Sequence, residues 1–161
     1  MKEIAGLISC ALKVVPKKML YESDIINAVS KFLNSQGYKI LQNLTENQRG
    51  DDIIAVSLDE SEKIFIEAKG ETSSKKSSAR FGKAFSRGQV RDHVANAFYK
   101  AAQKLQNNGR QSVRSGIALP KKQDHIDMVK EIRLALATLQ IEVFWVHSKE
   151  LVEVAGNWKV T

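Results

Sequence analysis

The chain has 161 residues, of which 43% are hydrophobic and 27% are charged, a composition typical of a globular domain. This length supports one domain with its own core and is too short for two ordinary domains. The 25 Lys and Arg residues outnumber the 18 Asp and Glu residues, so the formal net charge is +7 at pH 7. A basic surface favours polyanionic partners, of which nucleic acid is the commonest in a cytoplasm.

The apolar segments and the single cysteine limit the cellular setting. No apolar run reaches the roughly 18 residues that a membrane span requires, so no membrane partner is expected. The stretch IAGLISCALKVV, which ends before Pro16, lacks the charge pattern and cleavage site of a signal peptide and is predicted to be a helix packed on the domain. Cys10 as the single cysteine excludes an internal disulfide and a thiolate zinc site, which predicts a cytoplasmic protein.

The first half of the chain predicts one helix followed by three strands. Apolar residues at helical spacing predict an amphipathic helix over 21–35, which Gly37 ends. The strands are predicted over 38–44, 53–58 and 63–69. The polar turn DESE between the last two strands has hairpin length, so these strands are expected to pair antiparallel.

The second half predicts helices alternating with strands. The Ser-, Gly- and Lys-rich stretch over 70–82, extending to about residue 86, predicts a mobile loop. The elements expected after it are a helix over about 87–107, a strand over 113–119, a helix through 126–139 and a strand over 141–147 that is buried on both faces. Trp158 and Val160 suggest a further edge strand. The whole order predicts an α/β fold in which helices flank one central mixed sheet.

Two of the predicted strands carry unusual charge at one end. The second begins GDDI, with Asp51 and Asp52 at its mouth, and the third carries Glu67 and Lys69. Side chains two positions apart on a strand share a face, and a hairpin would bring the acids near this pair. Two carboxylates can hold Mg²⁺, for which Mn²⁺ is the expected substitute. The lysine can then orient or help to deprotonate a water that attacks a phosphate.

These residues resemble the motifs of the PD-(D/E)XK, or restriction-endonuclease-like, nucleases: Asp52 within GDDI, and Glu67-Ala68-Lys69 within FIEAKG. The family has an α-β-β-β-α-β core, and the resemblance covers about residues 20–147 of what would be a single nuclease-like domain over 1–161. It implies Asp52, Glu67 and the Ala68 carbonyl as metal ligands, with Lys69 acting on the nucleophilic water. The sequence departs from the family pattern in that no proline precedes the Asp.

The resemblance also implies further catalytic residues on the flanking helices. Family members often carry an acid on the first core helix, for which Glu22 is the candidate and Asp24 the second choice. Some carry a Gln on the helix after the motif, and Gln89 with His93 matches a Q-xxx-(H/Y) pattern. The alternatives are that Glu22 complements the helix dipole and that Gln89 and His93 are ordinary surface residues.

The central residues have structural alternatives as well. Glu67 and Lys69 could form an ion pair of modest value, although that leaves Asp52 unexplained. Asp51 competes with Asp52 as the ligand and has turn capping as its alternative role. The remaining histidines, His125 and His147, show no partner at metal-binding spacing and are interpreted as ordinary.

The stretch 72–91 is basic and contains no acidic residue. Its candidate nucleic-acid-binding residues are Lys75, Lys76, Arg80, Lys83, Arg87 and Arg91. It is expected to contact phosphates and to bring Phe81 or Phe85 to a base, and the alternative is a solvated loop. Lys121 and Lys122 could extend the basic track.

The sequence therefore predicts a magnesium-dependent nuclease that hydrolyses phosphodiester bonds, with a DNA endonuclease favoured. A non-catalytic DNA-binding module on the same fold is the first alternative, and a basic interaction protein in which these charges only stabilise the fold is the second. Cutting both strands of a duplex commonly needs two sites, which leaves a homodimer open.

Overall fold

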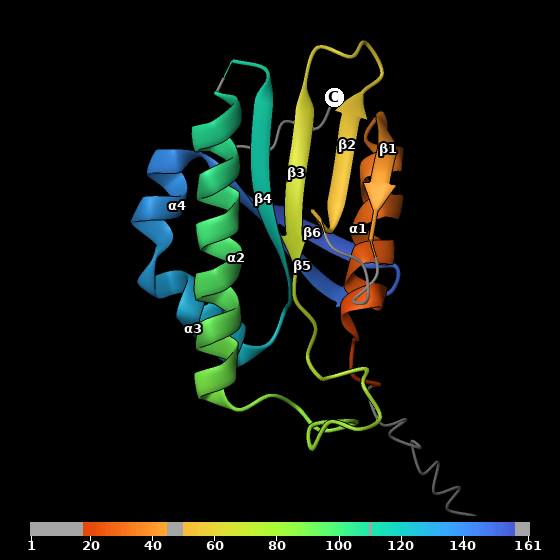
Figure 1. Cartoon of the computed structure of the whole chain (residues 1–161), viewed down its shortest axis with the longest axis vertical. Coiled ribbons are helices and arrows are strands. Elements are labelled where there is room, and N and C mark those ends of the chain that lie inside the picture. The colour runs from red at the N-terminus through yellow and green to blue at the C-terminus, as the bar shows by residue number, and fades with distance from the viewer. Residues whose placement is uncertain (1–17, 45–49, 110, 157–161) are drawn as a thin grey trace, which may run out of the picture.

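A computed structural model describes residues 18–44, 50–109 and 111–156, which form a six-stranded sheet in the order β1-β2-β3-β4-β5-β6 (Figure 1). The helices are α1 (Glu22–Ser35), α2 (Arg87–Asn108), α3 (Gln123–Glu131) and α4 (Arg133–Leu139). The strands are β1 (Tyr38–Asn43), β2 (Ile53–Ser57), β3 (Lys63–Ala68), β4 (Val113–Pro120), β5 (Ile141–Ser148) and β6 (Leu151–Ala155).

The sheet is mixed. β1, β2 and β3 pair antiparallel in succession, β4 runs parallel to both β3 and β5, and β6 closes the edge antiparallel to β5. From α1 to β4 the chain order is helix, three strands, helix, strand. These observations confirm an α/β fold with a central mixed sheet flanked by helices, and they confirm that the strands around the DESE turn form an antiparallel hairpin.

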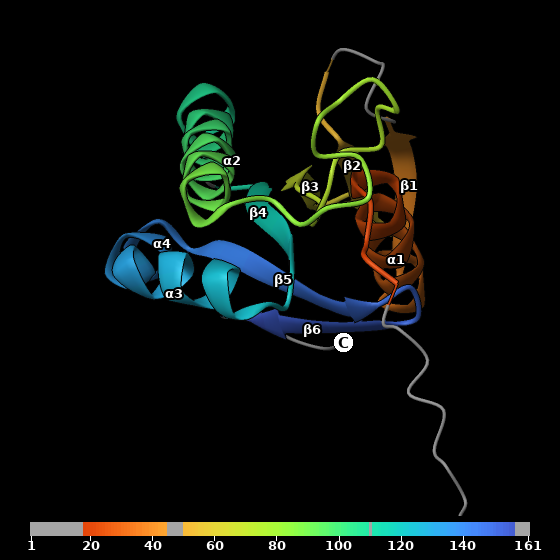
Figure 2. The ribbon, with the colours of Figure 1, turned by 90° about the horizontal axis from the view of Figure 1, so that it is seen from below.

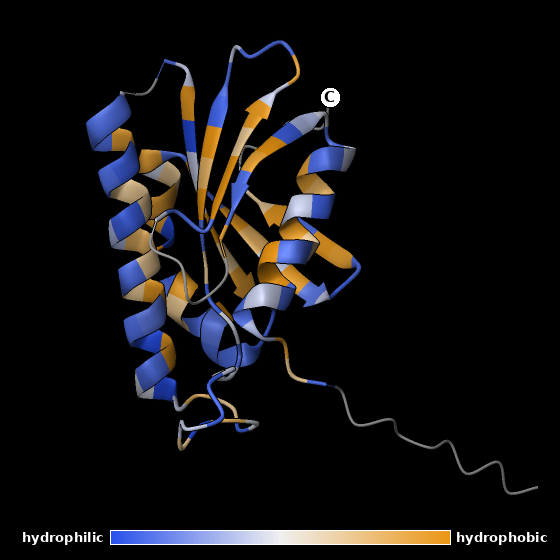
Figure 3. Ribbon diagram, turned by 45° about the vertical axis from the view of Figure 1, so that its right-hand side comes forward, coloured by the Kyte–Doolittle hydropathy of each residue, from blue (hydrophilic) through white to orange (hydrophobic). Residues whose placement is uncertain are grey.

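Helices cover both faces of the sheet (Figure 2). α1 packs one core, which includes Val29 with Ile66 and Phe144. α2, α3 and α4 pack a second core, which includes Val94 with Trp145. Because successive residues of β5 alternate between the two cores, this strand is buried on both faces, as its apolar sequence predicted. Figure 3 shows hydrophobic strands between helices whose outer sides are hydrophilic.

The ends of α1 follow from local chemistry. At its start the Asp24 carboxylate accepts a hydrogen bond from the Tyr21 backbone N–H at 3.1 Å. At its end Gly37 adopts φ +79°, which favours glycine, so the predicted helix stop is confirmed.

The structure differs from the sequence interpretation in two elements. The single helix expected through 126–139 divides at Ile132, whose φ of −113° and ψ of 12° lie outside helical values, and this break separates α3 from α4. The sequence interpretation also missed β6, an edge strand along which exposed and half-buried residues alternate.

Some expectations fall on residues outside those described: the N-terminal helix with Cys10, and the edge strand at Trp158 and Val160. Within the described ranges, no helix is both long and apolar enough to cross a membrane.

Candidate active site

The hairpin of β2 and β3 brings Asp52 to the end of β3. Ile53 pairs with Ile66 in the antiparallel register, so Asp52, which precedes β2, lies beside the residues that end β3. The Asp52 Oδ2 atom accepts a hydrogen bond from the Ala68 backbone N–H at 2.7 Å. The aspartate is therefore held directly beside the Glu67-Ala68-Lys69 segment.

Glu67 is a buried carboxylate held by two lysines. Its side chain is 5% exposed, and its Oε1 atom accepts hydrogen bonds from the Nζ atoms of Lys69 and Lys100, each at 2.6 Å. Ile66 and Ala68 face the core beneath α1, so Glu67 faces α2, from which Lys100 projects. Such a carboxylate is tolerated in the interior because cations and hydrogen bonds offset its desolvation. The structure thus brings together Glu67 and Lys69.

The negative charges of Asp52 and Glu67 repel each other. Burial, and then the negative charge of Glu67, raise the pKa of Asp52 to about 6, although the Ala68 N–H, Lys69 and Lys100 act to lower it. A cation bound between the carboxylates would relieve this repulsion.

The donor set fits a hard divalent cation. The hydrogen bonds described above use Oδ2 of Asp52 and Oε1 of Glu67, so a cation could be ligated through Oδ1 and Oε2 while those bonds persist. Mg²⁺ typically takes one or two carboxylates and keeps several waters, and the Ala68 carbonyl is a further oxygen on the same segment. In the described parts of the chain, no group of three or more His, Cys, Asp or Glu side chains is arranged to hold a metal ion.

A close approach of backbone brings Glu22 to the same place. A Cβ atom on Gly70 would lie 2.6 Å from the Glu22 backbone N, so glycine after Lys69 allows the start of α1 to pack against the end of β3. As a result the Glu22 Oε2 atom lies 4.0 Å from the Lys69 Nζ atom.

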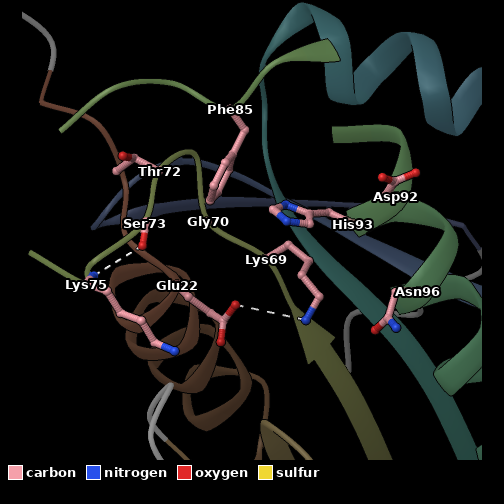
Figure 4. Close-up of a pocket in the computed structure, with 10 residues that line it drawn as sticks. All are labelled: Glu22, Lys69, Gly70, Thr72, Ser73, Lys75, Phe85, Asp92, His93 and Asn96. Carbon is pink, nitrogen blue, oxygen red and sulfur yellow. Dashed lines mark hydrogen bonds and ion pairs between the residues drawn. The ribbon is translucent and has the colours of Figure 1, made fainter. Parts of the chain in front are cut away.

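A cavity of about 530 Å³ opens beside Lys69 (Figure 4). Lys69 and Glu22 point toward each other on one side, and His93 and Asn96 project from α2 on the other. The other lining residues are Gly70, Thr72, Ser73, Lys75, Phe85 and Asp92. Because Lys69 both lines this cavity and bonds Glu67, it links the buried acid pair to a space that can receive a ligand.

The two predicted residues of α2 differ in position. The Gln89 side chain caps its own helix, because its Oε1 atom accepts hydrogen bonds from the Ser86 N–H at 3.0 Å and the Ser86 Oγ–H at 3.1 Å. One turn further, His93 lines the cavity. Burial lowers the pKa of His93, and the charge of Lys69 lowers it further. The structure therefore brings His93 to the site and leaves Gln89 at the helix cap.

Two lysines of α2 were missed by the sequence interpretation. Lys100 bonds Glu67, and Lys104 holds Asp51, with 2.7 Å between Nζ and Oδ1. A signal was present, because His93, Asn96, Lys100 and Lys104 recur at the spacing of one helical face. The Lys104 contact also distinguishes the two aspartates: Asp51 pairs with this lysine, whereas Asp52 bonds the Glu67-Ala68-Lys69 segment.

The loop over 70–86 contains no helix or strand, but its ends are tied by hydrogen bonds. The Thr72 hydroxyl donates to the Arg80 carbonyl at 2.7 Å, and the Phe85 N–H donates to the Glu71 carbonyl at 3.0 Å. These bonds hold Phe85 at the cavity wall.

The predicted basic residues differ in whether an acidic side chain already holds them. Lys75 lines the cavity, whereas Lys76, Lys83 and Arg91 are exposed and Arg80 is half-buried. Arg87 instead pairs with Asp124 and Asp127 of α3, at 3.0 and 3.2 Å. Lys121 and Lys122 also have acidic partners, Glu153 at 2.5 Å and Glu71 at 3.2 Å. A contact of Arg87, Lys121 or Lys122 with a phosphate would compete with these ion pairs.

The two remaining histidines lie away from the acid pair. His125 is buried on α3, and burial lowers its pKa to about 4, with a smaller contribution from His93. His147 lies 2.9 Å from the Glu153 carboxylate on the edge of the sheet.

No family model, curated protein or solved structure matches the chain.

Proposed function

We propose that the chain is a magnesium-dependent nuclease of the PD-(D/E)XK, or restriction-endonuclease-like, class, which hydrolyses phosphodiester bonds of DNA as an endonuclease. The observation that carries this proposal is the convergence of Asp52, Glu67 and Lys69 at the end of β3, with Lys69 at the wall of a cavity. The helix, three strands, helix, strand order from α1 to β4 supports it, because the class has this core order.

Each residue would contribute a defined step. Asp52 and Glu67, with the Ala68 carbonyl, would hold Mg²⁺, which when bound polarises a phosphoryl oxygen and lowers the pKa of a bound water. A lysine ammonium only donates hydrogen bonds, so Lys69 would orient the attacking water and stabilise the charge that develops on the phosphate. Glu22, whose Oε2 atom lies 4.0 Å from the Lys69 Nζ atom, would help to hold the ammonium at the cavity.

The substrate backbone would be held by the basic loop. Lys75, Lys76 and Lys83 belong to this loop, and no ion pair joins any of them to an acid among the described residues. Phosphate contacts by such residues release counterions, so DNA affinity should fall steeply with salt.

The experiment is a cleavage assay on supercoiled plasmid and single-stranded DNA with Mg²⁺, with Mn²⁺ and with EDTA. Cleavage is expected with either metal, and Lys69→Ala and Asp52→Asn should abolish it. Lys63→Ala on the same strand and Asp59→Asn in the same hairpin are matched controls that should retain it, since both side chains are exposed. Cleavage that survives Lys69→Ala and Asp52→Asn would come from a contaminating nuclease and would contradict the proposal.

A non-catalytic DNA-binding module is the second candidate. The pairing of Glu67 with both Lys69 and Lys100 favours it, because these ion pairs neutralise the buried acid without a metal. Salt-dependent DNA binding without metal-dependent cleavage of any substrate would support this candidate over the nuclease.

A further inference from the structure

We propose that the cavity beside Lys69 receives an unpaired nucleotide, so that the chain selects single-stranded DNA over fully paired DNA. This inference rests on the proposed function, since it names the substrate class of the same site.

The cavity has a size that favours a single nucleotide. Its volume of about 530 Å³ suits a single small ligand. The bases of a duplex are stacked and paired, so one of them can enter such a space only after it has been flipped out at an energetic cost. A single strand has no pairing to break and enters without that cost.

The cavity wall carries groups that can bind the phosphate and the face of a nucleotide. Lys75, which no ion pair joins to an acid among the described residues, brings positive charge for a phosphate, and Phe85 brings an aromatic ring (Figure 4). The Phe85 and His93 rings meet edge to face, with 4.5 Å between their centroids and an interplanar angle of 86°. Proteins hold single-stranded nucleic acid with cations that contact the backbone and aromatic side chains on which bases stack, because every base has a face that can stack.

Polar groups of α2 can bind the edge of an unpaired base. Asn96 and Asp92 line the cavity opposite Glu22, and both are exposed. An amide and a carboxylate can hydrogen-bond the Watson–Crick edge of a base, which is accessible only when the base is unpaired. The wall therefore offers partners for the phosphate, the face and the edge of one nucleotide.

The hydrogen bonds of the loop make this wall preformed. Glu71 accepts from the Phe85 N–H through its carbonyl, and its buried side chain contacts the Leu20 N–H at 3.2 Å and Lys122 at 3.2 Å. Binding is favoured when the partner groups are positioned beforehand.

The test is DNA binding, measured separately from cleavage. Fluorescence anisotropy with the Asp52→Asn protein in Mg²⁺ compares a labelled single-stranded oligonucleotide with the blunt duplex of the same sequence. The single strand is expected to bind at least about tenfold more tightly. Adding Phe85→Leu or Asn96→Ala should each weaken single-strand binding about fivefold and leave duplex binding unchanged.

Matched controls separate this effect from damage to the fold. Phe81→Leu alters the other phenylalanine of the loop, and Gln103→Ala alters an exposed residue of α2; neither residue lines the cavity, so neither change should affect the preference. Phe85 packs partly on the second core, so leucine preserves apolar volume and a thermal melt checks the fold. The exposed Asn96 provides a variant that leaves the core intact.

Equal affinity for the two forms, or an equal loss with Phe81→Leu and Phe85→Leu, would overturn the inference. The unmodified chain separates this failure from that of the proposed function. Cleavage of duplex and single strand at equal rates with Mg²⁺ would refute the inference and leave the nuclease standing. A single-strand preference in binding without cleavage of any DNA would refute the nuclease and leave the inference standing.

Discussion

Two clusters of charged residues lie at opposite ends of β3, and they differ in the cations that hold them. Just before β3, the guanidinium of Arg114 contacts Glu62 at 3.4 Å and the buried Glu142 at 2.7 Å. The Tyr38 hydroxyl donates to Glu62, and burial and then this carboxylate raise the pKa of Tyr38 to about 12. These groups stay protonated at ordinary pH and hold their acids in fixed geometry.

At the other end of β3, the acids are held by ammonium groups and by one backbone N–H. Lys69 and Lys100 carry their charges on flexible side chains, and the Asp52 carboxylate has a pKa raised to about 6 by burial and by Glu67. Buried charge alone therefore does not identify a functional site. What distinguishes this end of β3 is an acid pair, Asp52 and Glu67, under mutual repulsion and linked by Lys69 to a cavity.

The largest predicted effect on stability concerns the cluster that Arg114 forms with Glu62 and Glu142. Arg114→Met should lower the free energy of unfolding by about 3–5 kcal/mol, because it leaves Glu142, whose side chain is 3% exposed, without its cation. Urea unfolding measures the change, and Arg91→Met at an exposed position of α2 is the control. A loss below about 1 kcal/mol would show that this cluster is not structural.

Asp52→Asn should raise stability while removing activity. The ordinary pKa of Asp52 is 3.8 and the folded value is about 6, so folding favours the protonated form and the ionised form costs up to about 3 kcal/mol above pH 6. The penalty is absent below about pH 4 and grows as the pH rises to 6. Unfolding of both proteins at pH 4 and pH 8 should therefore show a gain only at pH 8, and an equal difference at both pH values would contradict the account.

Lys69→Met and Lys100→Met form a matched pair, since both lysines contact the same Glu67 oxygen at 2.6 Å. Only Lys69 lines the cavity, so its loss should lower kcat at least about 100-fold, whereas Lys100→Met should lower it less than about tenfold. Either variant should change the free energy of unfolding by about 1 kcal/mol, because one lysine still neutralises Glu67. Equal losses of activity in the two variants would show that Lys69, like Lys100, acts only as a structural partner of Glu67.

The smallest predicted effect concerns Gln89. Gln89→Ala should cost about 0.5–1 kcal/mol through the lost cap of α2 and leave kcat unchanged. A fall of more than tenfold in the single-turnover cleavage rate would instead support the catalytic role that the sequence resemblance implied.

Much of the fold could be predicted because its periodicities are local. The apolar spacing of α1 and the hairpin length of DESE predicted the elements and the pairing that the structure shows. The break at Ile132 was missed because the apolar spacing of Val129, Ile132 and Leu136 continues across it. β6 was missed because LVEVA is a short edge strand, half exposed along its length.

The candidate site could be predicted only in part, because two of its contacts depend on tertiary packing. The spacing of Glu67 and Lys69 predicts their contact within one strand. The contact between Lys100 and Glu67 depends on how α2 crosses the sheet, which charge spacing along a helix does not fix. Likewise, the approach of Glu22 to Lys69 depends on the packing of Gly70 against the start of α1.

The most direct test of the central claim is a crystal soaked in Mn²⁺, with the anomalous signal used to locate the ion. One ion ligated by Asp52 and Glu67 is expected, with no ion at this position in Asp52→Asn crystals. Crystals saturated with Mn²⁺ in which Glu67 still bonds Lys69 and Lys100 and no ion lies beside Asp52 would contradict it.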